Sequence, residues 1–269
     1  MISEQKNKVD AIIITHAHQD HIGSLPVVTR QEQRCPVFMT PATAAIATIM
    51  LHNSVNVMMR QREELGLMEY PLYTHRSVDL CAQSWVHCGL RQRYNLTGER
   101  SENDDEVTFE FYNAGHILGS VGVLIRHKGK SLFYTGDVNF ENQTLMTGAE
   151  FPEGGVDYLI METTRGDSPV PVGFTRAGEE ERFAKAVKEV ISSGGSLTIP
   201  VFALGKSQEL LAMLWKMRLR GEIGHLPIYI GGLSVKIKTV YDSFAATTPR
   251  SHPELKILHE MAPYVLSGR

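Results

Sequence analysis

The chain has 269 residues, of which 42% are hydrophobic and 21% are charged, and its formal net charge is −3. This length and composition can fill one large or two ordinary hydrophobic cores. Because residues 1–8 are polar and no run of eighteen apolar residues follows, we expect neither a signal peptide nor a membrane span. Three cysteines without a C-x-x-C spacing favour reduced, packed thiols, and hence a cytoplasmic protein.

A dense group of metal-binding side chains follows the first predicted strand. Residues 9–14 form an apolar, β-branched run that is typical of a buried strand, and the motif His-Ala-His-Gln-Asp-His comes directly after it, at residues 16–21. Imidazole and carboxylate suit zinc, and a site without cysteine is typical of a catalytic centre. His16 and His18 can reach one ion. Asp20 and His21 come one turn later, as a helix begins near Ile22, so the spacing predicts a second ion.

Helices and then strands fill the rest of the first half. We expect helices at 41–67 and 78–88, which would cover one face of a sheet, and strands near 37–39, 107–112, 121–126, 131–135 and 157–161.

Two of these strands end at candidate ligands. His116 lies between glycines after the strand at 107–112, and small neighbours let the backbone approach a metal closely. Asp137 follows the strand at 131–135 in a Gly-Asp pair, where its carboxylate could bridge two cations.

The second half reads as a smaller α/β unit. Residues 167–173 contain two prolines and a glycine and are the best candidate linker. Beyond them we expect helices at 178–192 and 206–218 and strands at 196–202 and 227–230. Residues 1–167 hold 14 Lys or Arg against 21 Asp or Glu, whereas residues 168–269 hold 13 against 9. This basic excess could neutralise a phosphate backbone, although charged residues often form only a solvated face.

Taken together, the His-x-His-x-Asp-His motif, the glycine-flanked His116 and Asp137 resemble the metallo-β-lactamase superfamily. The segments 114–120, 134–137, 161–166 (Met-Glu-Thr-Thr-Arg-Gly) and 199–211 (Ile-Pro-Val-Phe-Ala-Leu-Gly-Lys-Ser-Gln-Glu-Leu-Leu) look like its β-CASP branch, which cleaves nucleic acids. Members of that branch include the messenger-RNA 3′-end-processing endonuclease and J-type ribonucleases. The resemblance implies an α/β fold, the αββα sandwich of the superfamily over residues 1–167, with the first part of an inserted α/β β-CASP domain over 168–269.

Carried over by position, the resemblance makes His16, His18 and His116 ligands of one zinc, Asp20 and His21 ligands of a second, and Asp137 the bridge. Glu162 matches the acidic residue that opens the β-CASP motifs, where it pairs with a histidine that protonates the leaving group. Asp20, Asp137 and Glu162 are therefore the predicted catalytic residues. The late histidine motifs of the family are not recognisable, because His225, His252 and His259 lack the expected strand and glycine surroundings. Since strands usually precede the first motif as well, we expect a chain truncated at both ends.

Gly205-Lys206-Ser207 follows a predicted strand in the manner of a phosphate-binding P-loop. The full pattern requires a glycine five places before Gly205, where Pro200 stands, so an ATPase is not expected. Helix N-termini still favour anions, and Lys206 and Ser207 are therefore candidate substrate-binding residues.

The implied activity is zinc-dependent hydrolysis of RNA phosphodiester bonds by metal-bound hydroxide, with single-stranded RNA as substrate and two zinc ions per complete site. Neither Ser120 nor any cysteine lies in a pattern typical of a covalent nucleophile. Two alternatives stay open: hydrolysis of a small thioester or ester, which the motifs up to Asp137 do not separate from RNA cleavage, and an inactive fragment or scaffold. We expect a homo-oligomer or an RNA-processing complex and no membrane partner.

Overall fold

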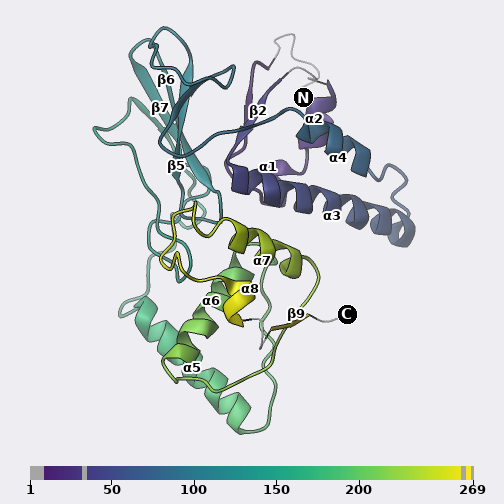
Figure 1. The fold of residues 1–269 in the computed structure, drawn as a ribbon, viewed down its shortest axis with the longest axis vertical. Helices are drawn as coiled ribbons and strands as arrows, with labels where there is room; N and C mark the ends of the chain where they lie inside the picture. Colours follow the sequence, from purple (N-terminus) through teal and green to yellow (C-terminus); the bar gives the residue numbers. More distant parts are fainter. Residues whose placement is uncertain (1–8, 32–34, 262–264, 268–269) are drawn as a thin grey trace. The chain divides into compact units, whose positions relative to one another are not determined.

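The computed structural model describes residues 9–31, 35–261 and 265–267 and divides into two compact units. Residues up to Glu141 and the stretch Gly148–Met161 form the first unit; Asn142–Thr147 and the chain from Glu162 onward form the second. The boundary near Met161 precedes the predicted one at residue 167, and the short segment 142–147 joins the second unit although it lies within the predicted first domain. Figure 1 shows the elements of each unit.

The first unit contains two sheets whose inner faces share one core. A three-stranded parallel sheet has the order β1-β2-β3, and a five-stranded sheet has the order β4-β5-β6-β7-β8, antiparallel except for the parallel pair β7 and β8. Phe38 of β2 packs in one cluster with Phe109 and Phe111 of β5 and Val123 of β6. The strands are β1 (Ile12–Ile13), β2 (Val37–Met39), β3 (Trp85–His87), β4 (Arg93–Asn95), β5 (Thr108–Asn113), β6 (Val121–His127), β7 (Lys130–Tyr134) and β8 (Tyr158–Ile160).

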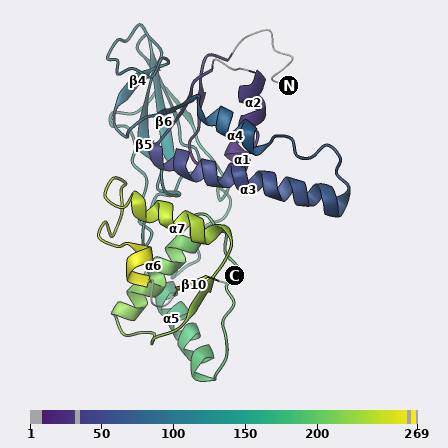
Figure 2. The ribbon, with the colours of Figure 1, turned by 45° about the vertical axis from the view of Figure 1, so that its right-hand side comes forward.

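Helices lie beside the smaller sheet: α1 (Gln19–Ile22), α2 (Leu25–Gln31), α3 (Pro41–Leu65) and α4 (His75–Ala82). Figures 1 and 2 both show α3 running alongside α4. Within the described ranges, α3 is the one helix long and apolar enough to cross a membrane, but 44% of its apolar stretch is buried. Its buried residues recur at helical spacing (Ala42, Ile46, Leu51, Val55), so α3 is built as a core helix of this unit.

The second unit packs its helices around apolar side chains of α6 and α7, among them Leu211, Met217, Ile237 and Tyr241. A parallel pair of strands, β9 and β10, completes it. The elements are α5 (Arg176–Ser192), α6 (Lys206–Leu219), β9 (Ile228–Ile230), α7 (Leu233–Ser243), α8 (Ile257–Met261) and β10 (Val265–Ser267).

The predicted α/β class is confirmed, and most predicted elements lie where expected, but three differ. The helix predicted at 78–88 ends at Ala82, and Trp85–His87 instead form β3, because these residues gain a parallel partner in β2. The strand predicted at 9–14 shortens to Ile12–Ile13. The strand predicted at 196–202 does not form and most of its residues are exposed; Pro200 lacks an amide donor, and β9 pairs with β10.

Candidate metal centre

The loop that carries His16 and His18 is held at the end of β1. Ile14 donates its amide to Phe38, and the Thr15 carbonyl accepts the amide of Val121, the first residue of β6, at 2.8 Å. The loop is thus fixed to both sheets at once. His16 is fully buried, and its Nδ1 lies 3.2 Å from Thr15 Oγ1, which turns Nε2 toward the other ligands.

The loop that carries His116 joins β5 to β6 and is closed by Ser120. The hydroxyl of Ser120 accepts the amides of His116 and Ile117, each at 3.1 Å. The hydroxyls of Thr40 and Thr43 at the start of α3 both donate to the Gly119 carbonyl at 2.9 Å. Gly119 has a φ of +79°, and a Cβ there would lie 2.7 Å from the Thr43 amide nitrogen. The helix α3 therefore fixes the position of this loop.

Asp137 reaches the site from the end of β7. Thr135 still pairs with Ile160 of β8, and Gly136 then turns with a φ of +55°. A Cβ on Gly136 would lie 2.9 Å from Cβ of Thr15, so only glycine lets the two loops approach this closely.

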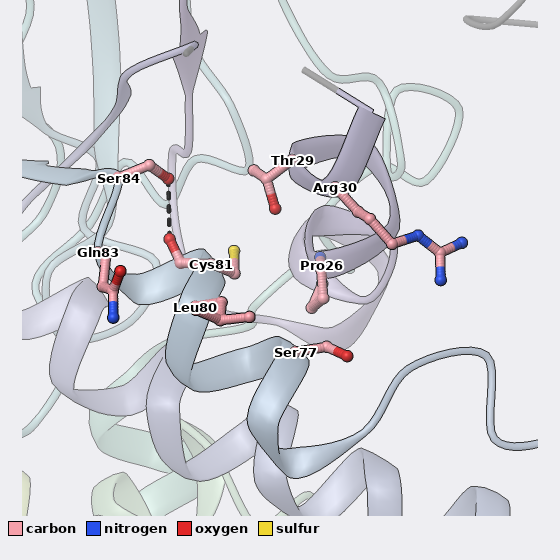
Figure 3. A pocket seen from close by; sticks show the side chains of 8 residues that line it. All are labelled: Pro26, Thr29, Arg30, Ser77, Leu80, Cys81, Gln83 and Ser84. Atoms are coloured by element: carbon pink, nitrogen blue, oxygen red, sulfur yellow. Dashed lines mark hydrogen bonds between the residues drawn. The ribbon is translucent and has the colours of Figure 1, made fainter. Parts of the chain in front are cut away.

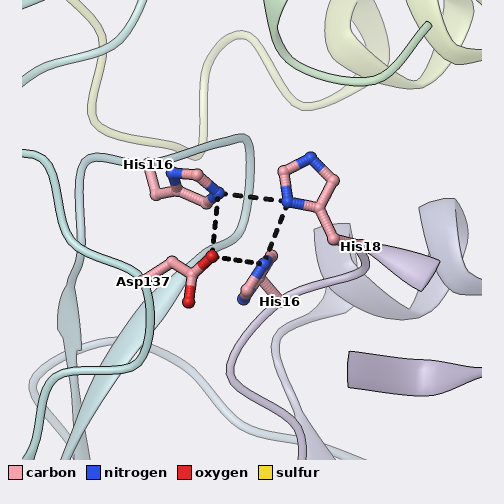
Figure 4. A group of neighbouring side chains, drawn as sticks. All are labelled: His16, His18, His116 and Asp137. Atoms are coloured by element: carbon pink, nitrogen blue, oxygen red, sulfur yellow. Dashed lines mark hydrogen bonds and ion pairs between the residues drawn. The ribbon is translucent and has the colours of Figure 1, made fainter. Parts of the chain in front are cut away.

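The four side chains His16, His18, His116 and Asp137 form a ring of donors, shown in Figure 4. Nδ1 of His18 lies 3.0 Å from Nε2 of His16 and 3.1 Å from Nε2 of His116. Oδ2 of Asp137 lies 3.7 Å and 3.6 Å from the same two nitrogens. Ligands about 2.0–2.1 Å from a tetrahedral zinc stand about 3.4 Å apart, so this donor set fits a zinc ion.

The electrostatics favour a neutral imidazole at His16, the form that binds metal. Burial, followed by the neighbouring His21, His116 and His18, lowers the pKa of His16 to about 2. His16 forms the closed side of the centre. The open side consists of Asp137, His116 and His21, whose side chains are 33%, 24% and 23% exposed.

His21 contacts Asp137 at its other oxygen and also contacts Asp20, while neither His21 nor Asp20 belongs to the group of four clustered ligands. Nε2 of His21 lies 3.5 Å from Oδ1 of Asp137 and 3.4 Å from Oδ2 of Asp20. Asp137 thus directs one oxygen to the ring of three histidines and the other to His21. The predicted role of Asp137 as a bridge between two ions stays a prediction.

A family model described as a metallo-beta-lactamase superfamily domain matches residues 1–164. The chain belongs to this superfamily. The superfamily and the clustered side chains together assign metal binding to the centre.

Similar proteins come from the RNA-processing members of this superfamily. The chain is 31% identical over 237 residues to an RNase J-like protein of Methanocaldococcus jannaschii, 31% over 241 residues to an Integrator complex subunit 11 homolog of Dictyostelium discoideum, and 31% over 247 residues to cleavage and polyadenylation specificity factor 73 of Drosophila melanogaster. These matches cover 88%, 88% and 89% of the chain but 50%, 30% and 33% of the relatives. They are consistent with the β-CASP branch expected from the sequence.

The other predicted site residues lie in the second unit. Glu162 follows β8, is half-buried, and stands outside the group of clustered ligands; its role stays a prediction. His252 lies 3.1 Å from Glu254 and Nδ1 of His225 lies 2.6 Å from Arg218, whereas the side chain of His259 falls outside the described residues.

The start of α6 differs from a phosphate-binding loop. The amides of Gly205, Lys206 and Ser207 donate to Gln208 Oε1, Leu204 O and Phe202 O. Ser207 is buried, whereas Lys206 is exposed. The Lys206 ammonium is therefore the group on which the predicted phosphate contact rests.

Covalent nucleophiles are absent from the described part of the centre. Ser120 is buried and its hydroxyl oxygen accepts two amides. Burial raises the pKa of the Cys81 thiol, and it raises that of Cys88 to about 12. Cys81 lines a cavity of about 360 Å³ between α2 and α4, shown in Figure 3, but none of the clustered ligands does.

Sequence reasoning missed the residues that hold the ligand loops. Thr40 and Thr43 carry an ordinary helix-capping pattern, and nothing in it indicates that they also bind Gly119. Asn113 lies just beyond the strand predicted at 107–112 and carried no prediction, yet its side chain accepts the Gly115 amide and donates to the Gly148 carbonyl. Its position just before the glycine-flanked histidine was the one available signal.

Proposed function

We propose that this chain is a zinc-dependent hydrolase that cleaves phosphodiester bonds of single-stranded RNA, with two zinc ions in the complete site. The observation that carries the proposal is the carboxylate of Asp137, whose two oxygens face His16 and His116 on one side and His21 on the other. Relatives named as an RNase J-like protein and as a cleavage and polyadenylation specificity factor support RNA as the substrate. Three buried cysteine thiols support a cytoplasmic location.

Each predicted site residue would have a separate role in such a reaction. His16, His18 and His116 would hold the first ion, Asp20 and His21 the second, and Asp137 both. Bound zinc would supply a nucleophile of lowered pKa and positive charge against the phosphorane-like transition state. Buried His16 excludes water from behind the site, while the half-open side formed by Asp137 and His116 admits the phosphate. Glu162 would orient the group that protonates the leaving oxygen.

The test is zinc content together with RNA cleavage, measured on the same sample. We expect close to two zinc ions per chain in protein purified without added zinc, and cleavage of labelled single-stranded RNA that a chelator removes and zinc restores. His16→Ala should lose both properties. His87→Ala, at an exposed histidine of β3 outside the ligand group, is the matched control and should lose neither.

Two outcomes would overturn the proposal. Zinc content no higher than that of His16→Ala would remove the metal centre. Full zinc content with hydrolysis of a small thioester or ester, and with RNA left intact, would keep the metal centre and replace the substrate.

A further inference from the structure

The loop that follows Asp137 leaves the metal centre and returns to it. Near its start, Asn139 donates its amide to Ala114 O at 2.9 Å; near its end, Glu150 donates to Asn113 O at 2.8 Å. Ala149 donates to Asn139 O at 2.8 Å and closes the base of the loop. Both ends therefore rest on the residues that lead into the His116 loop.

Gly115 shows how tight this base is. Its φ is +66°, and a Cβ there would lie 2.6 Å from Asn139 O and 2.7 Å from Ala149 N. The position of His116 is thus coupled directly to the base of the Asp137 loop, because the two backbones are in contact beside it.

The tip of the same loop, residues 142–147, belongs to the second unit. Oε2 of Glu209 accepts the amide of Leu145 and Oε1 accepts the amide of Met146, both at 2.9 Å. Leu145 and Met146 are buried, and the Ser251 amide donates to Leu145 O at 2.9 Å. The Ser251 hydroxyl also lies 3.2 Å from Met146 O. The backbone of residues 145–146 is thus held by hydrogen bonds to both Glu209 and Ser251.

Glu209 differs from a surface acid, because it is buried and its carboxylate binds two backbone amides. It is 7% exposed, and burial raises its pKa while the amides of Leu145 and Met146 lower it. A carboxylate is suited to this position because it has two acceptor oxygens. A glutamine has one acceptor oxygen and would turn an NH₂ donor toward the other amide.

We propose that Glu209 is a positioning residue for the metal centre: by binding the amides of Leu145 and Met146, it holds the loop whose base orients Asp137 and contacts the His116 loop. Only four residues separate Asp137 from the start of the tip at Asn142. The Gly205-Lys206-Ser207-Gln208-Glu209 turn, which is buried except at Lys206, therefore has a structural role. Gln208 accepts the Gly205 amide and donates to the Ala203 carbonyl, and Glu209 binds the tip. This inference rests on the proposed function insofar as it requires zinc at the ligand group.

The test compares Glu209→Gln with Glu179→Gln, which makes the same chemical change at a half-exposed acid of α5 that pairs with Arg182. Zinc affinity is measured by competition with a chelator, the ligand field by the visible spectrum of the cobalt-substituted chain, and the loop by hydrogen exchange of peptides spanning 138–150. For Glu209→Gln we expect faster exchange, a changed cobalt spectrum and zinc binding weakened by about 10–100-fold, as for loss of an outer-shell partner. Glu179→Gln should match the unsubstituted chain.

Faster exchange in Glu209→Gln with unchanged zinc affinity and cobalt spectrum would overturn the inference and leave the proposed function intact. A failure of the unsubstituted chain to bind zinc would overturn both. Should Glu209→Gln not fold, Ser251→Ala loosens the same tip without a change at the buried carboxylate. If that variant also exchanges faster but binds zinc as the unsubstituted chain does, the inference is wrong.

Discussion

A carboxylate lies near each end of strand β7, and the two carboxylates have different neighbours. At its start, Asp157 accepts Lys130 Nζ at 2.8 Å, the Ser131 amide at 2.9 Å and the Ser131 hydroxyl at 3.0 Å. Just beyond its other end, Asp137 faces imidazole nitrogens at 3.5–3.7 Å. Asp157 accepts hydrogen bonds from an ammonium, an amide and a hydroxyl. Asp137 and the histidines around it all have side chains of a kind that binds metals. The comparison separates an acid held by hydrogen-bond donors of the fold from one that lies among metal-binding side chains.

The largest expected effect follows from removing Asp137. Asp137→Ala should weaken zinc binding by more than about 100-fold, the upper range for loss of a partner outside the ligand set, and abolish RNA cleavage. The thermal midpoint of the metal-free chain should change little, because the Asp137 side chain is one-third exposed. Elemental analysis and calorimetry measure the two quantities. Retention of two zinc ions would contradict the bridging role.

A second prediction compares two glycine-to-alanine substitutions, one at each end of the five-stranded sheet. Gly115 lies at the metal end with a φ of +66°, and Gly129 lies in the β6–β7 turn with a φ of +71°. Both alanine variants should cost about 1–2 kcal/mol for left-handed backbone. Gly115→Ala adds overlap with Asn139 and Ala149, whereas a Cβ on Gly129 meets nothing within 4 Å.

We therefore expect Gly115→Ala to lose a further 1–3 kcal/mol or so of unfolding free energy, as in other overpacked sites, and to bind zinc more weakly. Gly129→Ala should keep its zinc affinity. Urea denaturation of the metal-free chains and a zinc titration make the measurement. Equal behaviour of the two variants would show that the contact between the loops does not matter.

The smallest effect is expected at Asp157. The Lys130 ammonium, followed by the Ser131 amide, lowers the pKa of this carboxyl to about 2 from its usual 3.8. Its stabilising effect is therefore present above pH 3.8 and is lost as the pH falls toward 2. Asp157→Asn should lower the thermal midpoint slightly at pH 7, since exposed ion pairs contribute little. The difference should close between pH 3.8 and 2, and zinc content at pH 7 should not change. A difference that is independent of pH would rule out this origin.

The clustering of His16, His18, His116 and Asp137 could be predicted because its signal is local. His16, His18, Asp20 and His21 occupy six positions of sequence, and His116 and Asp137 each follow a strand whose pattern is clear. The supports of that set were not predictable, because they depend on pairings made only in the folded chain: Thr43 with Gly119, and Glu209 with Leu145. The same reason explains β3, since Trp85–His87 become a strand only when β2 lies beside them.

The path of the chain between the two units also limits how the protein can be divided. The backbone passes from the first unit to the second after Glu141, returns after Thr147, and leaves again after Met161. A piece that ends at Met161 would keep every predicted metal ligand but expose Leu145 and Met146, which are buried in the whole chain. The first unit is thus not an independent module, because part of the loop that follows Asp137 packs with residues that come later in the sequence.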